Sequence, residues 1–143
     1  MEVLSDKDCV RVTKEGDWVY KAQSKFLTDN EIYCLKLMYP SGYVPFAEQV
    51  ANAVIRLEYI HDMPVTDFDV LNYHFSRVLK ALRDAGIRHG DLTKPNVLIR
   101  DNHPYLIDFA TARLFNDPRL DKRRGGDEKW LRQLFERLQN GLL

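Results

Sequence analysis

Two segments decide the fold of this 143-residue chain: residues 89–99, His89-Gly90-Asp91-Leu92-Thr93-Lys94-Pro95-Asn96-Val97-Leu98-Ile99, and residues 106–110, Leu106-Ile107-Asp108-Phe109-Ala110. They carry three oxygen-bearing side chains, Asp91, Asn96 and Asp108, beside apolar runs. Taken singly, each could be an ordinary turn residue, because Asp and Asn favour turns. Three such residues in one register rarely arise by chance, so we interpret them as one site.

The form of these segments is H-G-D-L-[ST]-x-x-N with D-F-x close behind, which resembles the catalytic loop and metal-binding turn of the protein-kinase-like superfamily. The resemblance implies that Asp91 is the catalytic base, which accepts the proton of the attacking hydroxyl. It also implies that Asn96 and Asp108 hold Mg²⁺, which bridges the phosphates of ATP. ATP and Mg²⁺ are therefore the expected cofactors. The resemblance runs along nearly the whole chain, but it is specific only from His89 to Ala110.

Within the superfamily, the H-G-D start and the Leu-Thr that follows are similar to RIO kinases and the small kinase of the tRNA-modifying KEOPS complex; the start is shared with aminoglycoside and choline phosphotransferases. Gly90 replaces the Arg that usually pairs with a phosphorylated activation loop, so we expect no such activation. Thr93 stands where typical kinases place a phosphate-contacting Lys, and Lys94, one position further, is assigned to the catalytic residues. His89 is expected to be a structural residue of the catalytic loop rather than a proton shuttle. Ala110 replaces Gly, which predicts a fixed turn with little switching.

A β-hairpin is predicted over residues 9–22, where extended runs at 9–13 and 18–22 are joined by Lys14-Glu15-Gly16-Asp17. Lys21, near the end of this hairpin, matches the kinase strand lysine that holds the α- and β-phosphates. The alternative is a solvated lysine on an edge strand.

Glu31 has two interpretations. It could be the helix glutamate that orients Lys21, or only the capping-box partner of Thr28, since a Ser/Thr cap is often followed three residues later by Glu. The helix is predicted to begin at Thr28 and to end at residues 40–42, Pro40-Ser41-Gly42.

The nucleotide side of the site lacks a Gly-rich phosphate loop. Gly16 lies too near the strand lysine, and residues 1–8 contain no glycine. We therefore expect the nucleotide lid to be missing or reduced, which would weaken ATP binding or permit hydrolysis. Residues 57–60 resemble the kinase hinge, so Glu58 and Ile60 are assigned to adenine binding, although an ordinary buried strand has the same composition.

Periodicity predicts the remaining elements. They are two strands within residues 44–50 and 53–60, a helix from Asp67 to Gly86, a hairpin of residues 97–99 and 105–107 around 101–104, and a closing helix after Asp127. The predicted order is strands, a helix, strands, a helix, a hairpin and a helix.

Asp127 is expected to brace the catalytic loop from below, to be a plain N-cap, or both. The loop before it is locally basic, with Arg113, Arg119, Lys122, Arg123 and Arg124 against Asp117 and Asp121. Such a loop could receive an acidic or phosphate-bearing substrate such as RNA, but charge runs are more often solvated surface. Nucleic acid is therefore not an expected partner, although the local charge does not exclude it.

Composition sets the remaining limits. Lys and Arg together number 21, and so do Asp and Glu, so no overall charge draws the protein to nucleic acid or to an anionic membrane. Residues 1–20 lack a basic segment followed by an apolar run, and no stretch approaches the roughly 18 apolar residues of a membrane span. We expect a cytoplasmic protein with no membrane partner, and the nucleus stays open. Cys9 and Cys34 are expected to be reduced packing residues.

The predicted fold class is α+β: a minimal two-lobed protein-kinase-like fold, with a small antiparallel N-lobe sheet and one helix, and a reduced helical C-lobe. Residues 1–60 form the predicted N-lobe, on the nucleotide-binding side. Residues 61–143 form the C-lobe, with the catalytic loop at 89–96 and the metal-binding turn at 108–110.

The expected function is an atypical, minimal ATP- and Mg²⁺-dependent phosphotransferase that acts on a protein or small-molecule phosphoacceptor. The alternative is a pseudokinase, a binding or regulatory module for a protein partner. The complete set of Asp91, Asn96 and Asp108 favours the enzyme, whereas Ala110 and the missing Gly-rich loop favour the pseudokinase. Substrate docking would have to come from residues 111–126 or from a partner protein.

Overall fold

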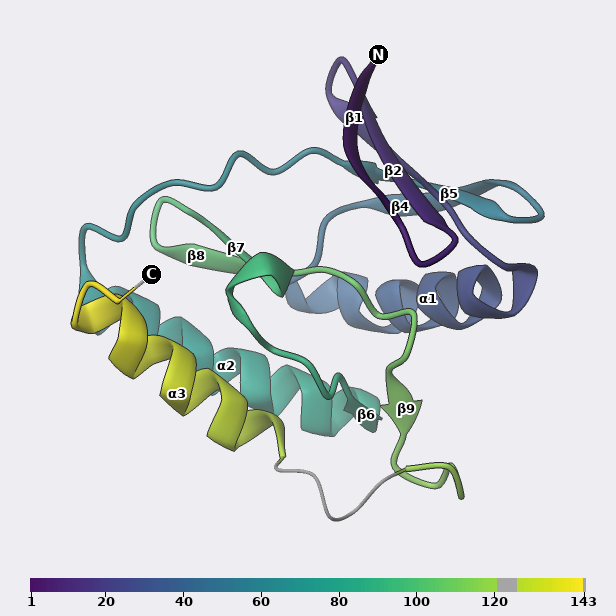
Figure 1. Ribbon diagram of the computed structural model, residues 1–143. Helices are drawn as coiled ribbons and strands as arrows, with labels where there is room; N and C mark the ends of the chain where they lie inside the picture. Colours follow the sequence, from purple (N-terminus) through teal and green to yellow (C-terminus); the bar gives the residue numbers. More distant parts are fainter. Residues whose placement is uncertain (121–125, 143) are drawn as a thin grey trace.

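The computed structural model describes residues 1–120 and 126–142. Its N-terminal part is an antiparallel sheet with the strand order β1-β2-β3-β5-β4. The strands are β1 (Glu2–Lys7), β2 (Val10–Glu15), β3 (Trp18–Ala22), β4 (Ala47–Ala51) and β5 (Val54–Glu58). One helix, α1 (Lys25–Met38), lies beneath this sheet (Figure 1). The predicted fold class, with a small antiparallel sheet and one helix, is confirmed.

Strand β1 has no counterpart among the predicted elements. It pairs with β2 through a tight turn at Asp8 and Cys9, whose φ angles are +55° and +62°. Two residues in the left-handed region suit a two-residue hairpin turn, but Cys gives no sequence signal for it. This hairpin of β1 and β2, the lid hairpin, lies where the expected nucleotide lid would be, and its turn contains no glycine.

Helix α1 begins earlier than predicted. Its N-cap is Ser24, whose hydroxyl accepts a hydrogen bond from the amide of Leu27 at 3.3 Å. Thr28 lies inside the helix and is fully buried. The capping-box prediction at Thr28 is therefore wrong, because a cap one turn upstream already starts the helix, and Glu31 is available for another contact.

The C-terminal part contains helices α2 (Phe68–Ala85) and α3 (Asp127–Gln139) and a hairpin of β7 (Val97–Arg100) and β8 (His103–Leu106). Helix α2 begins at its N-cap Asp67 and ends at Gly86, whose φ is +69°, as predicted. The hairpin turn uses Asp101 and Asn102, both with positive φ. These three predicted elements are confirmed.

Smaller elements complete the chain. Strands β6 (Ile87–Arg88) and β9 (Arg113–Leu114) pair with each other, and short 3-10 turns span η1 (Tyr39–Ser41) and η2 (Lys94–Asn96). None of these was signalled by periodicity, because none is longer than one period of the pattern that would reveal it. The strands predicted within residues 44–50 and 53–60 are present but shorter.

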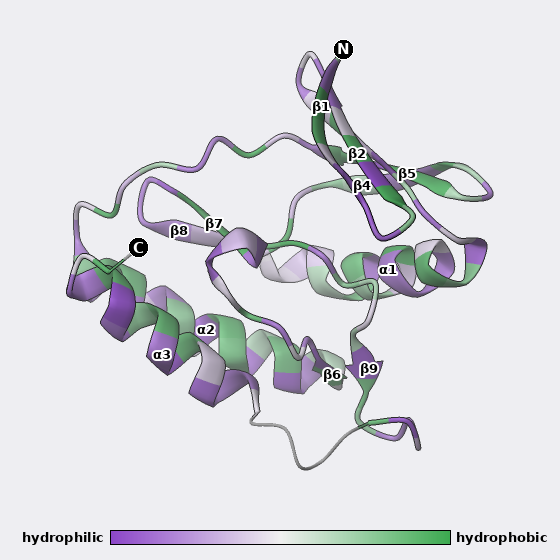
Figure 2. Ribbon diagram, in the orientation of Figure 1, coloured by the Kyte–Doolittle hydropathy of each residue, from purple (hydrophilic) through white to green (hydrophobic). Residues whose placement is uncertain are grey.

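One continuous apolar core joins both parts of the molecule. It contains residues from α1, β5, α2, the catalytic loop and α3, among them Leu35, Met38, Ile55, Leu71, Phe75, Val78, Leu92, Phe109, Leu131 and Leu134. Helices α2 and α3 lie side by side, each with hydrophobic and hydrophilic sides (Figure 2). The shared core packs the sheet, α1 and the catalytic loop against one another. The division of the chain at residue 60 stays a prediction.

Among the residues that the structure describes, none of the helices has the length and apolar character needed to cross a membrane. The two cysteines are both free but differ in environment. Cys34 is buried, and burial, reinforced by the charge of Glu31, raises the pKa of its thiol to about 11. Cys34 is thus the packing residue that was expected, whereas the packing prediction is wrong for Cys9, which is exposed at a turn.

A cluster of aromatic and imidazole groups fastens the segment after α1 to α2 and β8. The Tyr43 hydroxyl lies 2.8 Å from Nδ1 of His74, and the Tyr43 ring stacks on His103 with centroids 4.9 Å apart. Nε2 of His103 lies 2.7 Å from the carbonyl oxygen of Gly42, and the Leu106 amide donates to the Tyr43 carbonyl at 2.7 Å. These contacts join the N-terminal part to the C-terminal part beside the core.

Acid is expected to weaken this cluster. Burial, followed by the neighbouring His103 and Arg77, lowers the pKa of His74 below its ordinary value of 6.5. The unfolded chain then binds the proton more readily, so the free energy of unfolding should fall as the pH drops below about 6.5. Urea unfolding at about pH 7.5 and about pH 5.5 measures this loss.

The matched variants are His74→Gln, which keeps an acceptor for Tyr43, and His61→Gln, outside the cluster. The first should reduce the loss of stability in acid, and the second should leave it unchanged. If the stability of His74→Gln depends on pH as strongly as that of the wild type, His74 is not the group that weakens the fold in acid.

Candidate active site

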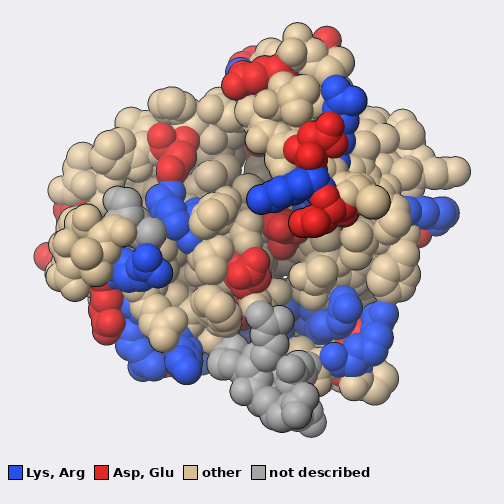
Figure 3. All heavy atoms as spheres, in the orientation of Figure 1, with Lys and Arg blue, Asp and Glu red and all other residues tan. Residues whose placement is uncertain are grey.

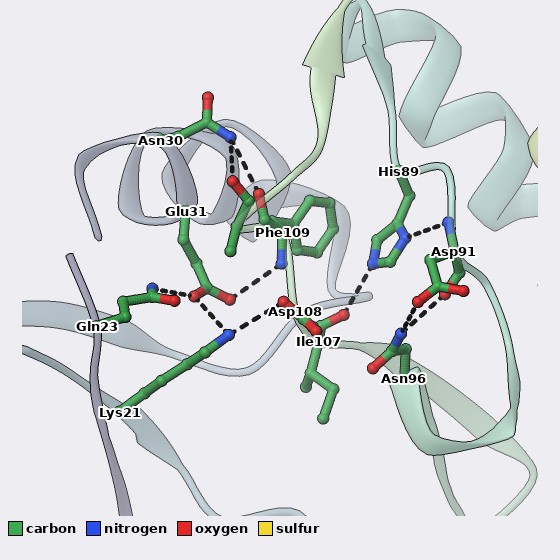
Figure 4. A network of polar contacts seen from close by, with 11 residues as sticks. Lys21, Gln23, Asn30, Glu31, His89, Asp91, Asn96, Ile107, Asp108 and Phe109 are labelled. Carbon is green, nitrogen blue, oxygen red and sulfur yellow. Dashed lines mark hydrogen bonds and ion pairs between the residues drawn. The ribbon is translucent and has the colours of Figure 1, made fainter. Parts of the chain in front are cut away.

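Lys21, on β3, meets two carboxylates between the sheet and the catalytic loop (Figure 4). Its Nζ atom lies 2.9 Å from Oε1 of Glu31 and 3.0 Å from Oδ1 of Asp108. Lys21 and Glu31 are buried, whereas the Asp108 side chain is 46% exposed. Because β3 is a central strand, Lys21 is not a solvated edge-strand lysine. Glu31 binds this lysine rather than the backbone at the start of its helix.

The Glu31 carboxylate accepts hydrogen bonds from two further donors. Besides the Lys21 ammonium, Nε2 of Gln23 donates to Oε1 at 2.8 Å and the amide of Phe109 donates to Oε2 at 3.0 Å. Gln23 was not assigned to the site from the sequence. The available signal was its place two residues after Lys21, because alternate residues of an extended chain share a face.

The charges of this network are mutually stabilising. Burial opposes the charged form of Lys21, but the carboxylates of Glu31 and Asp108 outweigh it, so the pKa of Lys21 lies above its ordinary value. The lysine therefore stays cationic at neutral pH and can attract an anionic ligand such as a phosphate.

The catalytic loop places Asp91 and Asn96 against each other. Nδ2 of Asn96 donates to the Asp91 carbonyl oxygen at 2.9 Å and to its carboxylate Oδ2 at 3.1 Å. This arrangement fixes the rotamer of Asn96 and leaves its side-chain oxygen as an acceptor. On the face of the molecule that Figure 3 shows, acidic side chains lie beside a hollow near the centre.

His89 joins the catalytic loop to the residue that precedes Asp108. Its Nδ1 accepts a hydrogen bond from the Asp91 amide at 3.2 Å, and Nε2 lies 2.8 Å from the carbonyl oxygen of Ile107. This pattern assigns the ring proton to Nε2. His89 is also buried against the ring of Phe109, with centroids 4.8 Å apart. With both ring nitrogens engaged, it acts as a structural link.

Asp127 braces the catalytic loop from below. Its two carboxylate oxygens accept hydrogen bonds from the amides of His89 at 2.8 Å and Gly90 at 2.9 Å. Gly90 has φ of +89°, which explains why glycine stands there. The N-cap of α3 is Gly126, so the N-cap interpretation of Asp127 is wrong while the bracing contact is present.

Lys94 lies outside the Lys21 network. Its Nζ is 2.6 Å from Oδ2 of Asp62, whose other oxygen accepts the Ile99 amide at 2.8 Å. Lys94 therefore fastens the linker between β5 and α2 to the catalytic loop. The catalytic role assigned to this lysine stays a prediction.

The predicted hinge, residues 57–60, begins in the last two residues of β5 and continues beyond the strand. The amide of Glu58 donates to the Phe46 carbonyl at 2.9 Å and that of Tyr59 to the Asp17 carbonyl at 2.8 Å. Ile60 is buried, and within the described residues its backbone amide has no backbone partner. The free backbone at Ile60 is compatible with adenine binding, which stays a prediction for Glu58 and Ile60.

The basic loop before α3 is partly neutralised by its own acids. Asp117 accepts hydrogen bonds from the backbone and side chain of Arg119 and lies 4.0 Å from Arg113, and these bonds lower the pKa of its carboxyl to about 2. The remaining basic residues of that prediction, Lys122, Arg123 and Arg124, and Asp121 lie outside the described residues.

Comparisons with known proteins agree with this geometry. The RIO1 family, described as a RIO domain, matches residues 6–140. The KEOPS complex subunit Bud32 of Pyrococcus abyssi is 29% identical over 120 residues, covering 70% of this chain and 54% of that protein. A probable bifunctional tRNA threonylcarbamoyladenosine biosynthesis protein of Methanosarcina barkeri is 33% identical over 94 residues, covering 64% of this chain and 17% of that protein.

Among solved structures, the Rio2 kinase from Chaetomium thermophilum aligns with a TM-score of 0.73 at 18% identity, over 96% of this chain and 57% of that chain. At this identity the likeness shows the fold. The chain spans 54% or less of the length of the two curated relatives above. The family match takes in the lysine strand, the catalytic loop and α3, and the chain belongs to the RIO domain family of atypical protein-kinase-like proteins.

Proposed function

We propose that this chain is an ATP- and Mg²⁺-dependent phosphotransferase of the atypical kinase type. The observation that carries the proposal is the Lys21 ammonium held between Glu31 and Asp108, at 2.9 and 3.0 Å. A buried lysine beside an exposed carboxylate provides a phosphate clamp and a metal ligand in adjacent positions. Membership of the RIO domain family supports the same class of activity.

Asp91 would be the base for the attacking hydroxyl. The residue is exposed, and the Asn96 amide binds only Oδ2 of its carboxylate, which leaves Oδ1 for the proton. Its backbone is fixed on both sides, since the amide binds His89 and the carbonyl binds Asn96. The base is therefore oriented before a substrate arrives.

Asn96 and Asp108 fit Mg²⁺ by their chemistry. Asn96 donates through Nδ2 and so keeps its oxygen for a cation, and among the described residues Oδ2 of Asp108 has no hydrogen-bond partner. Mg²⁺ is commonly held by one or two protein oxygens together with phosphate oxygens and water. When bound, the metal would neutralise charge on the phosphates of ATP.

A binding module without catalysis is the second candidate, and the lid hairpin favours it. The turn at Asp8 and Cys9 has no glycine backbone to wrap phosphates, and Asp8 adds a negative charge at its tip. Such a lid would lower the affinity for ATP or leave the phosphates open to water.

A protein partner that docks the phosphoacceptor is part of the proposal. The Pyrococcus relative is named as a subunit of a complex, and the Methanosarcina relative is named as a probable bifunctional protein. In this chain, α1 exposes Phe26, Tyr33 and Leu37, whose spacing of seven and four residues places them on one side of the helix. An apolar stripe of this kind suits burial against another protein.

The test is incubation of the wild-type protein with ATP labelled at the γ-phosphate, in Mg²⁺ or in EDTA, while released phosphate and label on protein are measured. The proposal expects Mg²⁺-dependent release or transfer. Nucleotide binding without either would favour the binding module instead.

A further inference from the structure

Asn30, on α1, is not one of the proposed catalytic or metal-binding residues, but its side chain hydrogen-bonds to the backbone that follows Asp108. Nδ2 of Asn30 donates to the carbonyl oxygens of Phe109 at 3.2 Å, Ala110 at 2.9 Å and Ala112 at 3.0 Å. Figure 4 shows this amide pointing at the backbone that follows Asp108. Three carbonyls that converge on one amide group form a specific contact rather than a chance one.

Glu31, the next residue of α1, binds the same segment as a hydrogen-bond acceptor. Oε2 of Glu31 accepts the amide of Phe109 at 3.0 Å, so Asn30 and Glu31 hold both the donor and an acceptor of one residue. The Phe109 carbonyl also accepts the Ala112 amide at 3.1 Å, which closes the segment into a turn. Residues 109–112 are thereby fixed to α1 at their backbone.

Asp108 needs such support. Its φ angle is +63°, a left-handed conformation that a residue with a side chain seldom adopts without being held by its surroundings. The residue after it, Phe109, carries the bonds to Asn30 and Glu31. Ala110, at the place of the usual glycine, does not have a positive φ, so the turn is held by contacts from α1 and not by glycine.

We propose that Asn30 is a positioning residue that sets the Asp108 carboxylate for metal binding, a role that rests on the proposed function. The hydrogen bonds of Asn30, which we call the latch, couple Asp108 to α1, the helix that also supplies Glu31 to Lys21. An outward shift of α1 would therefore break the Lys21–Glu31 ion pair and release the metal-binding turn together.

Asn30→Ala removes the amide group that donates to the three carbonyl oxygens and leaves every proposed metal ligand in place. The Mg²⁺ concentration that gives half-maximal ATP binding, measured by calorimetry on the full chain, is expected to rise about tenfold, because residues that orient a metal ligand typically contribute 10–100-fold to metal affinity. Saturating Mg²⁺ should restore binding. The matched control is Asp29→Ala, the preceding residue of the same helix, whose exposed carboxylate pairs with Lys25; it should leave the half-saturation unchanged.

Amide hydrogen exchange without nucleotide gives an independent measurement. Exchange at Phe109 and Ala112 should speed up in Asn30→Ala, while α2 keeps its wild-type protection. A wild-type Mg²⁺ half-saturation in a folded Asn30→Ala variant would overturn the positioning role. If the wild type itself binds no ATP with Mg²⁺, the proposed function fails and the positioning role fails with it; accelerated exchange in the variant would then show a purely structural latch.

Discussion

Asp91→Asn is expected to lower the rate of phosphoryl transfer by about 10²–10⁴-fold, the usual contribution of a positioned base. An asparagine keeps the shape of the side chain and can still accept the bond from Nδ2 of Asn96, so the loop should hold its conformation. ATP binding with Mg²⁺ should stay within about threefold of the wild type, because Asp91 is not a proposed metal ligand. Single-turnover transfer and calorimetry measure the two effects separately.

The control for this variant is Asp101→Asn, the same substitution in the β7–β8 turn. Asp101 has φ of +55°, which asparagine tolerates well. It should transfer phosphate at the wild-type rate. An Asp91→Asn variant with wild-type activity would remove Asp91 from the mechanism.

Lys21→Met is expected to reduce the free energy of unfolding by about 3 kcal/mol, because it leaves the buried carboxylate of Glu31 without its cation. The exposed fractions of the two side chains, 11% and 1%, place the pair well away from solvent. The remaining donors to Glu31, Gln23 and the Phe109 amide, keep the loss from being larger. Urea unfolding of both proteins at neutral pH measures the difference.

The double variant Lys21→Met with Glu31→Gln should recover part of this loss, since it removes the unpaired charge. Lys25→Met serves as the control: its exposed i,i+4 pair with Asp29 should contribute less than about 0.5 kcal/mol. If Lys21→Met loses no more unfolding free energy than Lys25→Met does, the Lys21–Glu31 pair does not stabilise the fold.

The sequence alone predicted the fold class and the elements with strong local signals. The motif from His89 to Ala110 carried the kinase-like fold, and α2 followed from its apolar period and its caps at Asp67 and Gly86. These features could be predicted because each depends on residues that are near one another in the sequence.

The features that escaped prediction depend on distant residues or on weak signals. Thr28 and Glu31 have the spacing of a capping box, but Ser24 caps the helix and Glu31 binds Lys21 from another element. The turn at Asp8 and Cys9 requires left-handed backbone that Cys seldom marks. Asn30 looks like an ordinary exposed helix residue until the chain brings residues 109–112 against it.

The partner of Lys94 could not be predicted either. Its catalytic role stays a prediction, and the chain places Asp62 beside it, a residue with no motif signal of its own. Pairing between distant side chains is decided by the tertiary fold, so a motif position alone could not reveal it.

The central claim is that Asp108 holds a metal that ATP needs for binding and reaction. Its most direct test is calorimetric titration of ATP with Mg²⁺ into the wild type and into Asp108→Ala, with phosphate release followed on the same samples. The account predicts Mg²⁺-dependent binding and turnover in the wild type and the loss of both in Asp108→Ala, with the variant still folded. Equal Mg²⁺-dependent binding in the two proteins, or none in either, would contradict it.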